Sequence, residues 1–495
     1  MLTDKARRLP CVAVVTGYGV ESRRTATNRC TFSSKSHVAK FGLLPPAWWA
    51  IECRCHLRGI LKIDMRRSKL RVLLIAEAAN PDWVSVPLVG WSLAKALCDQ
   101  VEGHLVTQIR NKDAISRTGW VEGSEFTAID TEALERPLWR AASLLRMGSD
   151  KGWTLTTAMR SLAYPYFEHL VWKKFGPDIR AGRYDVVHRI TPLSPTANSS
   201  IAKKCKKAGV PFIVGPLNGG VPWPPGFDTE RRREKEYLSY IRGMYKGLPG
   251  RRSMLSATSA IITGSRYTAS EIPNVHQSKC IHLPENAINP SRFNRVASQD
   301  LTLPLRGCFI GRMVPCKGTD MLLEAVAPHL RDGMLVLDMV GDGPMLASLK
   351  EIAKREGIEA GVTFHGWLEH ASVQEVAARS NLLLFPSVKD FGGGAVLEAM
   401  ALGVVPVVCD YAGPGELVSD DLGYKVQMGS REEIISRLRE QLARIIADPT
   451  ELPVKARAAR SHVFNEFTWE AKAGQVLQVY DWVLGRQPDK PRFDL

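Results

Sequence analysis

Short apolar runs alternate with amphipathic stretches along most of the chain. The first strong run covers residues 70–76, and apolar residues at helical spacing follow over 89–97. The pattern continues with three further predicted strands and one helix, at 184–188, 210–214, 260–263 and 201–208. Continuous apolar runs of this length are typical of strands buried on both faces of a parallel sheet.

A change of composition separates this set of elements from a second one. Asn, Pro, Ser and Arg accumulate over residues 286–304, which predicts a linker. Beyond it the alternation resumes, with strands expected at 307–310, 334–340, 362–365, 382–385 and 404–408 and helices at 319–329, 345–356 and 394–401. Because parallel strands need crossover helices, the pattern predicts an α/β chain with two doubly wound, Rossmann-like domains, at 65–285 and 305–465.

Composition limits the class of protein further. The chain has 495 residues, 45% hydrophobic and 24% charged, which excludes wholesale disorder. Its apolar stretches are shorter than the roughly 18 residues needed to cross a bilayer. The ten cysteines lie singly, apart from Cys53 and Cys55, which are too close together for a zinc knuckle. This pattern indicates free thiols in a reducing compartment and a cytoplasmic location.

The excess of positive charge is uneven. Of the formal net charge of +15, the first 64 residues carry +7, with eleven basic and four acidic residues. This leader has no hydrophobic periodicity, and Met65 stands just before the first strong strand. We therefore expect residues 1–64 to be a doubtful or disordered leader, with translation starting at or near Met65, and we place no chemistry there.

Two glycine-containing turns follow predicted strands of the second domain. In the first, 311–318, Arg312 and Lys317 precede a predicted helix. A strand-to-helix turn offers free N–H groups to an anion, and an arginine and a lysine there can hold a diphosphate, although two solvated surface cations would give the same pattern. The second turn contains Gly341 and Gly343 and is weak evidence alone, but ligands collect beyond the carboxyl ends of parallel strands.

The most informative segment covers residues 385–403. Gly392, Gly393 and Gly394 stand at a loop-to-helix junction, where glycine permits close approach of a ligand to the backbone. Asp390 precedes them, and Glu398 lies about one turn into the helix, so that one carboxylate can meet a sugar and the other a ribose. Singly, either acid could be an ordinary helix-terminal or helix-forming residue.

These segments together resemble the C-terminal domain of glycosyltransferase family 4, within the GT-B fold. The resemblance is strongest over residues 305–425 and extends more weakly back to Leu70. It implies catalytic roles for Arg312, Lys317 and Asp390, ribose binding by Glu398, and a donor site that also includes Gly311, Gly341, Gly343, Gly392, Gly393, Gly394 and Leu397. It also implies retention at the anomeric carbon with no metal or other cofactor, and a terminal helix within 466–495 that crosses back to the first domain.

The sequence departs from the family pattern at two places. The family usually has Glu at both ends of its carboxylate-x7-carboxylate motif, and here the first is Asp390. A second family position, often His, is Ile190, which leaves His188 as the nearby candidate, with a structural or a functional role equally open. For the acceptor we expect Asn80, Gly90, His188, Gly219 and Gly220 to contribute, and the Pro- and Trp-rich loop 215–226 is either a sugar platform or a structured loop.

The resemblance predicts a hexosyltransferase that uses a UDP- or GDP-sugar and a saccharide or lipid-linked acceptor, in polysaccharide or glycolipid biosynthesis. An epimerase-like GT-B enzyme is one alternative, and a basic nucleic-acid-binding protein is the non-enzymatic one, although no nucleic-acid module is recognisable. A basic run at 231–252, with tyrosines at helical spacing, predicts either peripheral contact with an anionic membrane or a solvated helix.

Overall fold

The structure is a computed structural model that describes residues 69–133, 152–234 and 250–493, with side chains described from residue 163 onward in the second range. The leader 1–64 lies outside these residues, as does 235–249, the greater part of the basic run. The expectations for both segments stay predictions.

The first lobe is built on a seven-stranded parallel sheet. Its strands are β1 (Arg71–Ala76), β2 (Glu102–Gln108), β3 (Phe126–Ile129), β4 (Val186–Thr191), β5 (Phe212–Leu217), β6 (Ala260–Thr263) and β7 (Cys280–His282). The order is β3-β2-β1-β4-β5-β6-β7, so the winding reverses between β1 and β4. This is the doubly wound arrangement predicted from the alternating pattern, with β2, β3 and β7 added to the strands that the sequence indicated.

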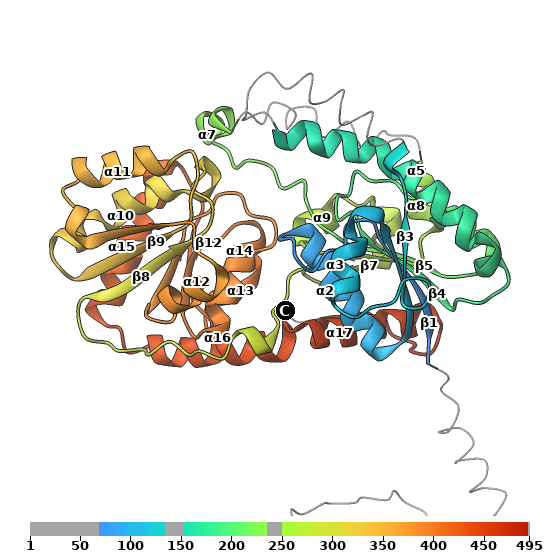
Figure 1. Ribbon diagram of the computed structural model, residues 1–495. Helices are drawn as coiled ribbons and strands as arrows, with labels where there is room; N and C mark the ends of the chain where they lie inside the picture. Colours follow the sequence, from blue (N-terminus) through green and yellow to red (C-terminus); the bar gives the residue numbers. More distant parts are fainter. Residues whose placement is uncertain (1–68, 134–151, 235–249, 494–495) are drawn as a thin grey trace, which may run out of the picture. The chain divides into compact units, whose positions relative to one another are not determined.

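Helices cover both faces of this sheet (Figure 1). Val72 and Leu74 of β1 pack in one core cluster with α2 (Val86–Gln100), whereas Leu73 and Ile75 pack in another with α5 (Gly152–Arg180) and α6 (Ile201–Ala208). Alternate residues of a strand point to opposite faces, so a strand that is apolar throughout needs a helical layer on each side. Three short helices complete the lobe, α3 (Lys112–Arg117), α8 (Arg251–Ala257) and α9 (Arg266–Ser270).

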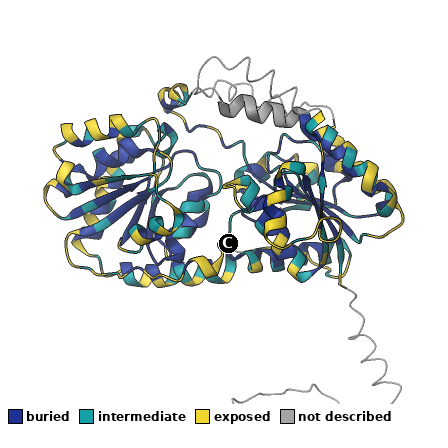
Figure 2. Cartoon of the chain, in the orientation of Figure 1, coloured by how far each residue is buried: buried dark blue, intermediate teal, exposed yellow. Residues whose placement is uncertain are grey.

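The second lobe contains a six-stranded parallel sheet of order β10-β9-β8-β11-β12-β13. The strands are β8 (Leu305–Ile310), β9 (Leu335–Val340), β10 (Val362–Gly366), β11 (Leu382–Phe385), β12 (Val405–Cys409) and β13 (Tyr424–Val426). The helices are α10 (Thr319–Arg331), α11 (Leu346–Arg355), α12 (His370–Ala377), α13 (Gly394–Ala401), α14 (Ala412–Leu417), α15 (Arg431–Ala447) and α16 (Leu452–Glu466). The predicted elements of this lobe are all present, and Figure 2 shows the sheet as its buried centre.

A segment that follows β5 packs on the second lobe rather than on its own sheet. Trp223 and Phe227 belong to the core cluster of the second lobe, and Phe227 is fully buried there. Helix α7 (Asp228–Arg233) follows, and Glu234 accepts a hydrogen bond from the backbone N–H of Cys316 at 2.8 Å. We call residues 221–234 the arm. The burial of Trp223 in this core indicates that the loop 215–226 is a structured loop, which is the second of the two alternatives that the sequence left open.

The terminal helix α17 (Trp469–Val483) crosses back to the first lobe, as predicted. Val476, Val479 and Tyr480 are buried in the same core cluster as α2 and β1. None of the helices in the described ranges is long and apolar enough to cross a bilayer.

His188 links this helix to the first sheet. Its Nε2 lies 2.8 Å from the carbonyl oxygen of Gly215, which can only accept, so Nε2 carries the proton and Nδ1 accepts from the Tyr480 hydroxyl at 2.7 Å. The ring is fully buried, and this desolvation lowers the pKa of His188 from 6.5 to about 4. Both ring nitrogens are used inside the fold, which corrects the expectation of an acceptor-binding role in favour of the structural one.

The buried ring predicts an acid-sensitive contribution to stability. The unfolded chain binds a proton at His188 below pH 6.5 and the folded chain only near pH 4, so the unfolding free energy should fall by about 3 kcal/mol as the pH drops across this window. Urea unfolding of His188→Gln at pH 7.5 and pH 4 should show a correspondingly smaller difference than the wild type. His169→Gln, at an exposed position, is the control. An unchanged pH dependence in His188→Gln would contradict the assignment.

Candidate functional site

The second sheet reverses its winding between β8 and β11, which are adjacent and parallel. The loops that follow these strands, 311–318 and 386–393, therefore open at one edge of the sheet on either side of the reversal. Open α/β sheets bind ligands at this position, because the two loops diverge and leave a crevice between them. The structure thus brings together the two segments that the sequence singled out.

Loop 311–318 carries two cations with different surroundings. Arg312 is exposed, and its guanidinium has no hydrogen-bond or ion-pair partner among the described residues. Lys317 ends a 3-10 turn, Pro315–Lys317. Its side chain is 19% exposed, and its ammonium lies 4.9 Å from the centroid of the Phe385 ring. One cation is therefore free to meet an anion, and the other is held in place.

Asp390 holds Lys317 and closes the glycine loop at the same time. Its Oδ2 accepts from the Lys317 ammonium, and its Oδ1 accepts from the backbone N–H groups of Gly392 and Gly393 at 3.2 and 3.1 Å. In this structure the carboxylate is thus engaged by the protein itself. An ammonium has further N–H donors, so Lys317 can bind an anion while Asp390 keeps its orientation.

The glycines of this loop are needed for reasons that differ between positions. Gly393 has φ +58° at the start of α13, and Gly394 is the first residue of that helix. A Cβ on Gly392 would lie 2.2 Å from Asn286 Nδ2 and 2.3 Å from Glu285 Oε1. Gly392 is therefore in direct contact with side chains of the segment that follows β7 in the first lobe.

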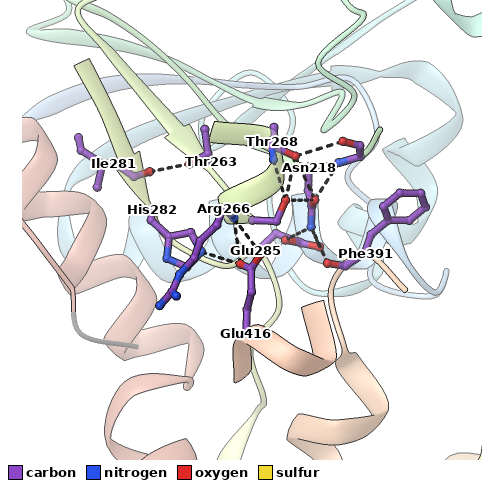
Figure 3. Close-up of polar contacts among 11 residues, drawn as sticks. Asn218, Thr263, Arg266, Thr268, Ile281, His282, Glu285, Phe391 and Glu416 are labelled. Carbon is purple, nitrogen blue, oxygen red and sulfur yellow. Dashed lines mark hydrogen bonds and ion pairs between the residues drawn. The ribbon is translucent and has the colours of Figure 1, made fainter. Parts of the chain in front are cut away.

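Three residues that the sequence analysis missed surround the glycine loop. Asn218 donates from Nδ2 to the carbonyl of Phe391 at 3.0 Å, and Asn286 donates to the carbonyl of Gly392 at 2.8 Å. Glu285 is buried and accepts from Asn218 Nδ2 at 2.7 Å (Figure 3). A signal existed, because Asn218 directly follows β5 and Glu285 and Asn286 follow β7, where the carboxyl ends of parallel strands collect polar side chains.

A second contact joins the lobes beside this one. Glu416 of α14 accepts from the backbone N–H of Arg266 at 2.9 and 3.0 Å, at the start of α9, and from His282 Nε2 at 3.2 Å (Figure 3). The free N–H groups of a helix start favour an acidic partner. The glycine loop and α14 are thus both tied to the carboxyl end of the first sheet.

The buried groups behind the loop have strongly shifted proton affinities. Desolvation raises the pKa of Glu285 to about 7, and the hydrogen bond from Asn218 opposes this shift. Burial lowers the pKa of Lys472 to about 7, and its ammonium has no hydrogen-bond partner among the described residues. Each group feels the charge of the other, which lowers the pKa of Glu285 and raises that of Lys472 and so opposes the effect of burial on both.

Glu398 has different neighbours from Asp390. It lies on α13, its side chain is 40% exposed, and Oε1 is 3.7 Å from His370 Nε2. It lines a cavity of about 670 Å³ together with Phe293, Trp469 and residues of α2. Lys317 and Asp390 do not line this cavity. The side chain of the adjacent Leu397 is buried in the core, so a contribution of this residue to a donor site would come from its backbone.

The remaining acceptor candidates are also engaged within the fold. Asn80 is buried and donates to Asn111 at 3.3 Å, and a Cβ on Gly90 would lie 2.1 Å from the carbonyl oxygen of Ala78. The carbonyl of Gly219 accepts from the Thr268 hydroxyl, and Gly220 has φ +84° in the same turn. These contacts shape the carboxyl edge of the first sheet, and they correct the expectation that the side chain of Asn80 is available to a ligand.

The turn that contains Gly341 and Gly343 supports loop 311–318 rather than offering a separate binding surface. A Cβ on Gly341 would lie 2.0 Å from the carbonyl oxygen of Gly311, and one on Gly343 would lie 2.4 Å from that of Met313. The N–H of Met313 donates to the carbonyl of Asp342 at 2.9 Å. The two turns are therefore packed backbone on backbone.

Comparison with known proteins agrees with this geometry. Residues 305–444 match the family model of Glycosyl transferases group 1. A 2-deoxystreptamine glucosyltransferase from Streptomyces kanamyceticus is 29% identical over 180 residues, which are 36% of this chain and 46% of that enzyme. The chain thus spans about half the length of this curated relative.

Solved structures show the fold. A glycosyltransferase from Rickettsia africae has a TM-score of 0.55 at 14% identity, over 85% of this chain and all of that one. Anabaena HepE in complex with UDP and glucose has a TM-score of 0.52 at 16% identity, over 83% and 99%. The chain therefore has the GT-B fold of two facing Rossmann-like lobes, and its C-terminal lobe is related to the group 1 glycosyltransferases.

The packed turns predict a strong effect of a single methyl group. Gly341→Ala must move the carbonyl of Gly311 and adopt φ +128°, so we expect a loss of about 2–4 kcal/mol in unfolding free energy, measured by urea unfolding. Gly357→Ala is the matched control, since Gly357 also has a positive φ, +64°, but a Cβ there meets nothing within 4 Å. It should cost about 1 kcal/mol. Equal losses in both variants would show that backbone strain alone matters.

Proposed function

We propose that the chain is a retaining, family 4-like glycosyltransferase that transfers a sugar from a nucleoside diphosphate sugar to a saccharide or lipid-linked acceptor. The observation that carries the proposal is the pair of cations at the reversal of the second sheet, with Arg312 exposed and Lys317 held by Asp390. The relatedness of the C-terminal lobe to group 1 glycosyltransferases and the fold shared with HepE in its UDP complex support it.

The reaction separates a sugar from a diphosphate that leaves as an anion. Arg312 can present a planar fork to phosphate oxygens, and Lys317 a compact charge whose position Asp390 fixes. Charge that is placed before the reaction begins needs no reorganisation when the anion develops, and such a group contributes about 10²–10³ in rate. The N–H groups at the start of α13 add partial positive charge at the same edge.

The donor base and the sugar acceptor are the finer parts of the proposal. The resemblance favours UDP or GDP as the nucleotide, with Glu398 binding the ribose, and the Glu398 side chain is 40% exposed. The carboxyl edge of the first sheet faces the acceptor. The same proposal includes a role in polysaccharide or glycolipid assembly in the cytoplasm. It also includes peripheral contact with the membrane through residues 231–252, which flotation with anionic liposomes tests.

Donor binding gives the first test of this assignment. We expect calorimetric titration of the full chain with UDP, GDP and their sugars to show saturable binding to one nucleotide class. Lys317→Ala and Glu398→Ala should each weaken it about tenfold or more, because each removes a charge-assisted contact. Lys350→Ala, an exposed cation on α11, should bind as the wild type does. Saturable binding that both site variants leave unchanged would refute the assigned site.

Removal of divalent cations gives a second, independent test. Because Arg312 and Lys317 supply the positive charge for the diphosphate, we expect turnover of the donor to continue at an unchanged rate in excess EDTA. The measurement is release of the nucleotide, with and without added Mg²⁺ or Mn²⁺. A loss of turnover in EDTA that either cation restores would contradict metal-independent catalysis.

A further inference from the structure

A buried polar cluster joins the first lobe to the glycine loop and has no part in the proposed chemistry. Asn218 and Asn286 donate to two consecutive carbonyls, those of Phe391 and Gly392, at 3.0 and 2.8 Å. Figure 3 shows Asn218, Glu285 and Phe391 converging from the two lobes. Because each side-chain amide holds the carbonyl of one of two successive peptide groups, together they fix the orientation of the backbone there.

The side-chain amide of Asn218 is itself fixed by hydrogen bonds at both its oxygen and its nitrogen. Asn218 is 7% exposed, its Oδ1 accepts from the Ser265 hydroxyl at 3.0 Å, and its Nδ2 lies 2.7 Å from both oxygens of Glu285. Glu285 in turn fits between two glycines, because a Cβ on either Gly264 or Gly392 would lie 2.3 Å from one of its oxygens. Asn218 therefore presents its N–H in one direction before any ligand arrives.

The geometry of the peptide group carries this constraint to the other side of the loop. In a planar trans peptide the C=O of one residue and the N–H of the next point in opposite directions. Holding the carbonyl of Phe391 therefore aims the N–H of Gly392, and holding the carbonyl of Gly392 aims the N–H of Gly393. These are the two N–H groups that Asp390 Oδ1 accepts. Without such restraint, consecutive glycines would rotate freely.

We propose that Asn218 and Asn286 are positioning residues of the donor site: from the first lobe they fix the two peptide groups that orient Asp390, and through Asp390 they set the position of Lys317. What the loop binds rests on the proposed function. The affinity for the nucleotide then depends on contact between the lobes as well as on the lobe that carries the cations.

Asn286 gives the sharpest test, because its side chain makes one hydrogen bond among the described residues, whereas Asn218 makes several. The variants are Asn286→Ala and the isosteric Asn286→Asp, which keeps the shape but cannot donate an N–H. Gln299→Ala is the matched control. Gln299 is also a side-chain amide that donates to a backbone carbonyl of the second lobe, that of Gly403 at 2.7 Å, but beyond the opposite end of α13 from the glycine loop. It has longer contacts with Asn381 as well.

Two measurements are made on the full chain, hydrogen exchange of the segment 386–396 and titration with UDP and GDP. We expect both Asn286 variants to exchange about fivefold faster at Gly392 and Gly393 and to bind the nucleotide about three- to tenfold more weakly. The melting temperature should change no more than in Gln299→Ala, which should match the wild type in exchange and affinity. A purely structural bond would lower stability without a selective change in the loop.

The outcomes separate the two proposals. Exchange and affinity in Asn286→Ala that equal those of Gln299→Ala would overturn the positioning role, even if the wild type binds nucleotide. A wild type that binds neither nucleotide would overturn the proposed function, and the exchange of Gly392 and Gly393 alone would then decide the positioning role. Full function in Asn286→Asp would also overturn it, because the amide donor would then be dispensable.

Discussion

The site depends on one carboxylate that accepts from three donors. Asp390 receives the Lys317 ammonium on one oxygen and two backbone N–H groups of the glycine loop on the other. Charge-assisted hydrogen bonds of this kind are stronger than neutral ones, and here they join two loops that come from different strands. Loop 311–318, loop 386–393 and the start of α13 keep their mutual position through this residue.

The second requirement is close backbone packing, which glycine alone permits. Gly341 lies against the carbonyl of Gly311, Gly318 against that of Pro386, and Gly413 against that of Phe391. In each case an added Cβ would lie between 2.0 and 2.4 Å from a backbone oxygen. Of the glycines expected in the donor site, Gly341 and Gly343 are the ones that make this kind of contact, and they bring the two turns together.

The sequence predicted the second lobe more completely than the first. Its strands are continuous apolar runs, and its turns carry glycines at characteristic positions, so the ends of β8 to β12, α10, α11 and α13 were predicted to within two residues. Helix α12 was not predicted. Strand β2, by contrast, begins Glu102-Gly103-His104 and is not apolar at its start, and β7 has only three residues. Such strands are stabilised by their neighbours in the sheet, which a local pattern does not record.

The site was predicted in part for a similar reason. Arg312, Lys317, Asp390 and the glycines stand in local motifs, so their types and spacing were informative. Asn218 and Glu285 act through partners 173 and 67 residues away in sequence, and no short motif encodes such a distance. For His188 the sequence left a structural and a functional role equally open, because its partner Tyr480 lies 292 residues further on.

The arm has a consequence for the evolution and engineering of this architecture. Residues 221–234 belong to the first lobe by chain order, yet Trp223 and Phe227 complete the core of the second. A lobe exchanged at the linker alone would leave these aromatic rings without their cavity and leave a gap in the core of its new partner. The two lobes are therefore not freely recombinable modules in this chain, and the arm must travel with the lobe whose core it fills.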